Sequence, residues 1–223
     1  MKRLFIILIL SFFMGLKAEA QSFNGGILAG AVTSQVQGVQ MQDAQVQGDR
    51  YSGFHQLGWT AGAYVNLPLS DNFTWQTELK YSLFGSHSDV KEVVEYGMNQ
   101  YDLRLHYIEM PIMFRYNLER FNVGSRSLDF ITLEIGPSLD FLMRYKDDTN
   151  TSLNERAPWL FFSITGNIGI HFDLSERWGI GVRSMNSLTP IRIKGDVPLF
   201  SFGHYYNVAL QAVVTYNLKA PNK

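Results

Sequence analysis

Charged side chains recur at alternate positions of this sequence, and their types could support acid–base chemistry inside a protein. Eight of them fall on the polar side of alternating segments: Glu78, Lys80, Glu109, Arg115, Glu134, Asp140, Arg144 and Arg183. Two carboxylates held together could act as acid and base or pass a proton. Burying such charges unpaired is strongly unfavourable. We therefore predict that they pair as an interior charge network, with a catalytic pair or proton path as the alternative.

A second group of residues could be drawn as a hydrolytic triad. Such a site needs a nucleophile, a base and an orienting carboxylate within reach of one another. His171 lies beside Asp173 on an inward face, and Ser163 precedes them on the same segment. Residues two apart on a strand are only stacked neighbours. The remaining histidines lie in or beside loops or on an apolar face, so we predict no catalytic residues, no cofactor and no metal site.

The elements that must position these residues are extended segments with one apolar and one polar face. Residues 72–84 show the pattern most clearly, because Phe73, Trp75, Leu79 and Tyr81 alternate with polar residues such as Glu78. Side chains of a strand point to opposite faces with a period of two. Thirteen residues at ~3.3 Å each, tilted ~45°, rise roughly 30 Å and could cross a membrane.

Seven other segments repeat the pattern, and their connections alternate between long and short. The expected strands are residues 22–34, 55–67, 104–116, 127–145, 158–172, 177–187 and 204–218. Long polar loops are expected at 35–54, 85–103, 146–157 and 188–203, and short connections at 68–71, 117–126 and 173–176. Pro111 would remove a ladder hydrogen bond, so we expect a bulge there. The fold class predicted is all-β: an eight-stranded antiparallel up-and-down transmembrane β-barrel with long external loops and short periplasmic turns.

Aromatic residues on the apolar face favour a membrane barrel over a soluble one. Trp and Tyr concentrate where lipid meets water, because their rings have an apolar body and a polar tip. The polar face is mostly Gly, Ser, Thr, Asn and Gln, whereas a soluble barrel would carry more charge outside. We predict an aromatic girdle formed by Trp75, Tyr81, Tyr116, Trp178, Tyr206 and Tyr216. An eight-stranded barrel is just wide enough for side chains to fill.

Composition and the N-terminal residues indicate an exported chain. Lys2 and Arg3 precede an apolar run, and Ala18-Glu19-Ala20 supplies a small-x-small cleavage site. We expect a signal peptide at residues 1–20 and an outer-membrane barrel domain at 21–223, in a Gram-negative-type cell. The net charge of −1 gives no basis for nucleic-acid binding. The chain has no Cys, so its stability cannot depend on disulfides.

Two segments carry a family resemblance. Glu78, Leu79, Tyr81 and Ser82, with Gly85 nearby, form a Glu-Leu-x-Tyr-Ser pattern, and Tyr107, Glu109 and Pro111 form a Tyr-x-Glu-x-Pro pattern. In these motifs the chain resembles the PorT-like family of outer-membrane β-barrels. The resemblance implies an eight-stranded barrel without enzymatic activity. It also implies an accessory role in secretion for some relatives.

We therefore expect a non-enzymatic outer-membrane barrel with a structural or accessory role in protein secretion or surface assembly. The alternatives are a lipid-modifying or protease-type barrel enzyme, and a barrel that binds or adheres through surface loops. The expected partners are outer-membrane lipid and a protein that contacts external loops 35–54 and 85–103. Apolar residues within the second loop favour such a contact: Val90, Val93, Val94, Tyr96, Met98 and Tyr101.

Overall fold

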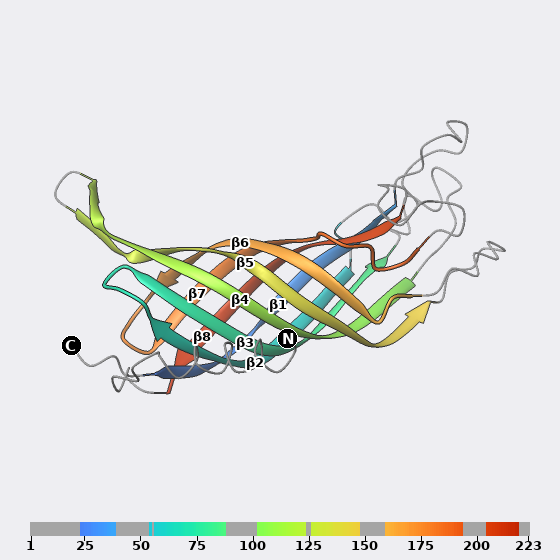
Figure 1. The fold of residues 1–223 in the computed structure, drawn as a ribbon, viewed down its shortest axis with the longest axis horizontal. Coiled ribbons are helices and arrows are strands. Elements are labelled where there is room, and N and C mark those ends of the chain that lie inside the picture. The colour runs from blue at the N-terminus through green and yellow to red at the C-terminus, as the bar shows by residue number, and fades with distance from the viewer. Residues whose placement is uncertain are drawn as a thin grey trace, which may run out of the picture.

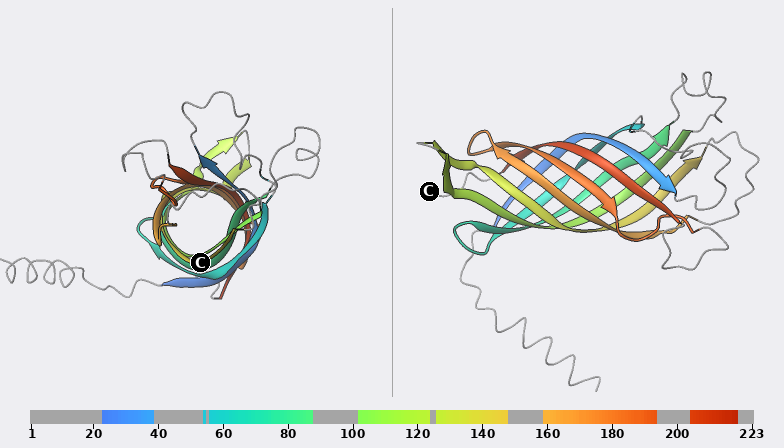
Figure 2. Two further views of the ribbon diagram at one scale, coloured as in Figure 1. Left: turned by 90° about the vertical axis from the view of Figure 1, so that its right-hand side faces the viewer. Right: turned by 90° about the horizontal axis from the view of Figure 1, so that it is seen from above.

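Eight strands of alternating polar and apolar residues pair edge to edge until the sheet closes on itself. The computed structural model describes residues 23–38, 54, 56–87, 102–123, 126–147, 159–193 and 204–218. The strands are β1 (Asn24–Gly38), β2 (Gln56–Pro68), β3 (Phe73–His87), β4 (Asp102–Val123), β5 (Arg126–Asp147), β6 (Phe162–Asp173), β7 (Trp178–Ser187) and β8 (Tyr205–Asn217). Each pairs antiparallel with the next, and β8 pairs with β1 (Figures 1 and 2). The predicted eight-stranded barrel is confirmed.

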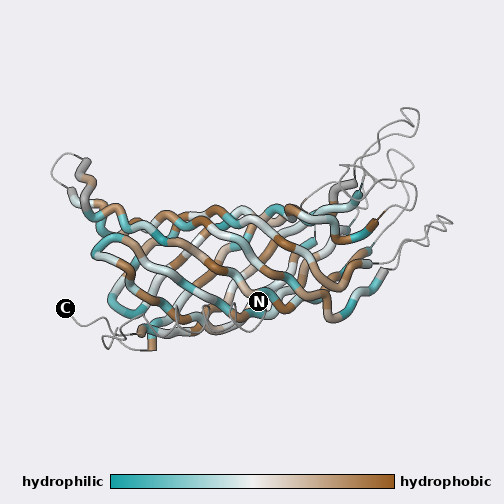
Figure 3. Tube along the Cα trace, viewed as in Figure 1, coloured by the Kyte–Doolittle hydropathy of each residue, from teal (hydrophilic) through white to brown (hydrophobic). Residues whose placement is uncertain are grey.

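The alternation of each strand separates an outer apolar surface from a packed interior. In β3, Gln76, Glu78, Lys80 and Ser82 are buried, whereas Leu79 between them is exposed on the outside. Brown and teal alternate along the strands in Figure 3 for the same reason. No helix in the described part of the chain is long and apolar enough to cross a membrane.

Three connections meet at one end of the barrel, which we call the short-turn end. Two of them share a sequence pattern, Leu-Ser-acidic-x-aromatic, at residues 69–73 and 174–178. In each turn the Leu and Ser backbone N–H groups donate to the carbonyl oxygen of the aromatic residue. The Ser hydroxyl accepts a hydrogen bond from the aromatic residue's N–H, at 3.2 Å for Phe73 and 3.1 Å for Trp178. Ser side chains favour such turns because they can bond to nearby backbone.

The third connection at this end differs from the expected short loop at residues 117–126. β4 continues to Val123 and β5 begins at Arg126, so the two strands form a hairpin that extends beyond the other turns (Figures 1 and 2). The register shifts between Asn117 and Leu118 and again between Leu118 and Asn122. The hairpin is therefore a less regular extension of the barrel wall.

The strand ends that the four remaining connections join lie at the opposite end, which we call the loop end. The strands there reach further than expected, because β1 ends at Gly38, β3 at His87, and β4 begins at Asp102. Residues 39–53, 88–101, 148–158 and 194–203 lie outside the described residues. The apolar residues of the expected loop 85–103, from Val90 to Tyr101, belong to this part.

Two expectations about β4 and β5 are wrong: the bulge at Pro111 and the interior position of Arg144. Pro111 pairs with Ser138 and Phe114 pairs with Ile135, which is the same register. No bulge therefore occurs at the proline. The irregularity lies further along, where His106 pairs with Arg144 but Tyr107 pairs with Leu142. A bulge adds one residue and reverses the faces beyond it. Leu142, which precedes the bulge, is buried as the alternation predicts, whereas Arg144 beyond it is exposed rather than inside the barrel.

Candidate functional site

The centre of the barrel interior is occupied by buried ion pairs around Arg183 of β7. Its side chain is 1% exposed, with Nη2 lying 2.7 Å from Glu78 Oε1 and Nε 2.7 Å from Glu134 Oε2. Glu78 comes from β3 and Glu134 from β5, so one guanidinium joins strands from opposite walls. An Arg side chain suits this position because its planar group can bond two carboxylates in a fixed geometry.

Arg115 and Lys80 extend this arrangement on either side. Arg115 Nε lies 2.9 Å from Glu134 Oε1, and Arg115 Nη1 donates to Gln76 Oε1 at 2.7 Å. Lys80 Nζ lies 3.9 Å from Glu78 Oε2 and donates to Gln211 Oε1 at 3.0 Å. These contacts tie four strands together through their side chains.

Glu109 and Asp140 lie one step nearer the loop end and face each other across β4 and β5. Glu109 Oε2 lies 3.6 Å from Lys80 Nζ and accepts a hydrogen bond from Ser82. Asp140 accepts hydrogen bonds from Ser138 and Thr165. Among the described residues, no cation lies within ion-pair distance of Asp140. The Asp140 carboxylate is therefore satisfied by hydroxyl donors and not by an ion pair.

The structure brings together seven of the eight predicted network residues. We call Glu78, Lys80, Glu109, Arg115, Glu134, Asp140 and Arg183 the interior charge layer. Arg144 is excluded because the bulge in β5 turns it outward. Arg183 has room to cross the barrel because Gly169 lies beneath it: a Cβ there would come within 2.7 Å of Arg183 Cγ.

An apolar cluster fills the barrel between the interior charge layer and the loop end. Its buried members are Val32, Val36, Phe84, Leu103, Leu105, Tyr107, Leu142, Met185, Ile191 and Ala209. Ile191 comes from the segment after β7, whose backbone bonds to Leu160 and Tyr205. Arg192 covers this segment, with its guanidinium 5.0 Å from the Trp159 ring centroid and 5.8 Å from that of Tyr205.

Sequence reasoning missed this apolar cluster, although a signal was present. Leu103, Leu105 and Tyr107 alternate on one face of β4, but Leu103 was assigned to a loop. His204, expected beside a loop, is fully buried at the same end.

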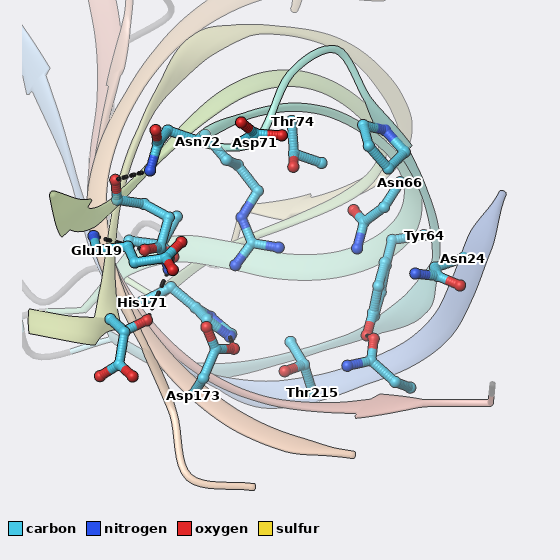
Figure 4. Close-up of a pocket in the computed structure, with 16 residues that line it drawn as sticks. Asn24, Tyr64, Asn66, Asp71, Asn72, Thr74, Glu119, His171, Asp173 and Thr215 are labelled. Carbon is cyan, nitrogen blue, oxygen red and sulfur yellow. Dashed lines mark hydrogen bonds and ion pairs between the residues drawn. The ribbon is translucent and has the colours of Figure 1, made fainter. Parts of the chain in front are cut away.

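A polar cavity opens at the short-turn end, on the other side of the interior charge layer. It has a volume of about 570 Å³, and Arg115 is among its lining residues. Tyr64 and Asn66 point into it from one wall, and His171 and Asp173 from the opposite wall (Figure 4). We call this cavity the polar cup. Sequence reasoning placed His171 inward but did not find the cup, because its lining comes from residues far apart in the chain.

The triad that could be drawn from His171, Asp173 and Ser163 is not assembled in the structure. His171 Nε2 lies 3.4 Å from Asp173 Oδ1, but its Nδ1 has no hydrogen-bond partner in the part of the chain that the structure describes. The Thr215 hydroxyl lies on the same side of the ring, because a Cβ built at Gly179 would touch both Nε2 and that hydroxyl. A relay needs the nucleophile and the carboxylate on different ring nitrogens. Ser163 instead lies near the opposite end of β6. Among the described residues, no group of three His, Asp or Glu could hold a metal.

The six residues of the predicted girdle all lie on the outer face. Trp75, Tyr116, Trp178 and Tyr216 gather near the short-turn end, where the rings of Trp178 and Tyr216 lie 4.8 Å apart. Tyr206 lies near the loop end. Tyr81 packs beside Trp59, and its hydroxyl lies 2.5 Å from His106 Nδ1.

Comparison with known proteins finds one family whose model matches this chain. Residues 19–192, a range that contains β1 to β7, match the model of a family described as "Outer membrane protein beta-barrel domain". No curated protein matches the chain.

Several solved structures of small barrels are similar to this one. Ail, the attachment invasion locus protein of Yersinia pestis, is 9% identical with a TM-score of 0.43, and the match covers 87% of this chain and 98% of that chain. Neisserial surface protein A is 10% identical with a TM-score of 0.48, covering 86% and 96%. Outer membrane protein W of E. coli is 12% identical with a TM-score of 0.35, covering 86% and 97%.

Proposed function

Because the chain belongs to the family of outer-membrane protein β-barrel domains, we propose that it is a sealed, non-enzymatic platform in that membrane. The observation that carries this proposal is the closed interior. The interior charge layer and the apolar cluster lie one above the other along the barrel axis, and Arg183, Lys80 and Tyr107, which are among the largest fully buried side chains, belong to them. In outer-membrane barrels the short turns face the periplasm and the long loops face outward. A solute entering from either side would meet one of these layers.

Planar-bilayer recording tests the seal. The purified barrel is expected to give no stable conductance, because ions would have to displace buried ion pairs and cross an apolar layer. A porin inserted under the same conditions serves as the positive control. Long-lived openings of porin size from this protein would contradict the proposal.

We also propose an accessory role in secretion or surface assembly, which the resemblance to PorT-like barrels supports. A sealed barrel can act by displaying contact surfaces, and the external loops around residues 35–54 and 85–103 are the proposed contact for a partner protein. Replacing residues 88–101 with a Gly-Ser segment of equal length leaves the ends of β3 and β4 intact. Partners that co-purify with the wild type should then be lost. Retention of every partner would argue against this loop as the contact.

The geometry of His171 supports the proposal that the barrel is not a hydrolase. Asp173 and the Thr215 hydroxyl lie on the side of Nε2, and Nδ1 has no partner among the described residues. Incubation with phospholipid or a peptide library should release no product. Turnover that Asp173→Asn abolishes would favour the enzyme alternative.

We also propose that the chain is exported with residues 1–20 as a cleaved signal peptide. N-terminal sequencing of the outer-membrane form should then begin at Gln21. A mature protein that begins at Met1 would refute the cleavage site.

A further inference from the structure

We propose that the short-turn end is a docking site for an extended basic segment of a periplasmic protein. The β4–β5 hairpin would supply a free strand edge, and the polar cup would receive a cationic side chain. This inference concerns the periplasmic end and is independent of the external loops.

The polar cup is accessible from one side only. At its base Arg115 is held by Glu134 at 2.9 Å and by Gln76 at 2.7 Å, which places the interior charge layer beneath it. Its volume of about 570 Å³ lies within the range of ligand-binding cavities. A ligand that reaches the cup must therefore come from the periplasm.

The charges that line the cup select a cation. Asp71, Glu119, Asp129 and Asp173 line it, against Arg115 and His171. In the described part of the chain, the carboxylates of Asp71, Glu119 and Asp129 have no cation within ion-pair distance. Arg115 is already engaged by Glu134, so the cup has an excess of negative charge. A Lys or Arg side chain would be attracted by these uncompensated carboxylates.

His171 and Asp173 form one wall of the polar cup, where they lie 3.4 Å apart. The His171 side chain is buried, with the residue 3% exposed, and it points into the cup (Figure 4). Within the described ranges, neither its Nδ1 nor Asn66 Oδ1 across the cup has a hydrogen-bond partner. When Nε2 carries the proton and donates to Asp173, Nδ1 is an acceptor. Both atoms are buried, so the exposed carboxylates of Asp71, Glu119 and Asp129 are the groups that a ligand entering the cup would meet.

The hairpin next to the cup offers a place for a peptide backbone. The last pair between β3 and β4 at this end is Phe73 with Tyr116, and the last pair between β5 and β6 is Ile131 with Phe172. Asn117 N–H still donates to Asn72 O. From Leu118 of β4 and up to Phe130 of β5, the described residues pair only between these two strands, so both outer edges lack a neighbouring strand there. Exposed strand edges accept an added strand through main-chain hydrogen bonds.

The two features are adjacent and can act together. Glu119 of β4 and Asp129 of β5 line the cup from the base of the hairpin. Phe121 on the hairpin is 53% exposed and gives an apolar contact beside the edge. An added strand would present alternate side chains toward the barrel, where a cation meets the acidic rim.

The test measures binding of a short, acetylated and amidated peptide of alternating Lys and Val to the full-length protein in nanodiscs. We expect saturable binding that weakens as salt is raised. Glu119→Gln combined with Asp129→Asn should reduce affinity about tenfold or more, because two attractive charges are removed. Asp102→Asn, a matched neutralisation at the loop end, should change it little. Phe121→Ser should also weaken binding, whereas Phe161→Ser, at the loop end, should not.

Two further peptides separate docking from general charge attraction. A peptide with Glu in place of Lys should not bind, and one with a central Pro should bind much more weakly because it lacks a backbone N–H. Circular dichroism and thermal unfolding verify that each variant is folded. Absence of binding to the Lys peptide, equal binding of the Pro peptide, or equal weakening by Asp102→Asn would overturn the proposal. Binding of cell-wall glycans in place of the peptide would also overturn it.

Discussion

At the scale of single residues, Arg183 is the centre of the buried charge arrangement. Arg183→Met keeps much of the volume but leaves Glu78 and Glu134 without their shared cation. Breaking a buried pair in this way should cost ~3–5 kcal/mol in the free energy of unfolding. Urea unfolding in lipid vesicles measures the change. Arg104→Met is the control, because Arg104 pairs with Asp102 near the surface and such pairs contribute at most ~1 kcal/mol. Equal losses for the two variants would contradict the central role of Arg183.

Individual contacts follow from sequence only where the alternation of a strand is unbroken. Glu78, Lys80 and Arg183 could be assigned to the interior because their strands keep a period of two throughout. Arg144 could not, because a single inserted residue in β5 reverses the faces and leaves no mark in the residue pattern. Which charges pair across the barrel also depends on the stagger between strands, which alternation does not specify.

At the scale of elements, close contacts between strands determine where a side chain can be accommodated. A Cβ at Gly136 of β5 would overlap the carbonyl oxygen of Ile112 on β4, and this obstacle is backbone that cannot turn aside. Gly136→Ala should therefore destabilise the barrel by ~1–3 kcal/mol, as overpacking does. Gly166→Ala on β6 is the matched control, since its Cβ would lie 3.4 Å from the side chain of Leu188. That change should stay within about 0.5 kcal/mol in the same unfolding assay. Similar values for the two would show that the sheet relaxes around Gly136.

Strand number and turn position were accessible from sequence, whereas strand length was not. The turns at 69–73 and 174–178 contain residues that favour turns, and they separate clearly alternating segments. The β4–β5 hairpin extends past residues 117–126 because its two strands continue to pair after their barrel neighbours have turned. That extension depends on pairing between strands and on local register shifts. The polar cup, whose rim includes this hairpin, was therefore not predictable either.

At the scale of the whole molecule, a barrel of eight strands is narrow enough for side chains to fill. A filled barrel could therefore be predicted from the number of alternating segments in the sequence. The division of the interior into a polar cup, a charge layer and an apolar cluster did not. The apolar cluster depends on Leu103 and Ile191, which lie at or beyond strand ends and turn inward only in the closed barrel. The proposed functions at the two ends depend on this division, because the sealed centre separates them.

The outer surface determines how the whole molecule sits in the bilayer. Leu79 lies near the middle of β3 and is 58% exposed, so its side chain should meet the centre of the hydrocarbon layer. Leu79→Arg should cost ~2–4 kcal/mol in equilibrium folding into lipid vesicles, because a charge at that depth loses its hydration. Leu174→Arg is the same substitution in the 174–178 turn, where Leu174 is 63% exposed and should lie in water. It should have little effect, since the cost of a charged residue falls away toward the interface. A larger loss for Leu174→Arg would mean that the apolar band lies elsewhere on the barrel, and the assignment of the two ends would have to be revised with it.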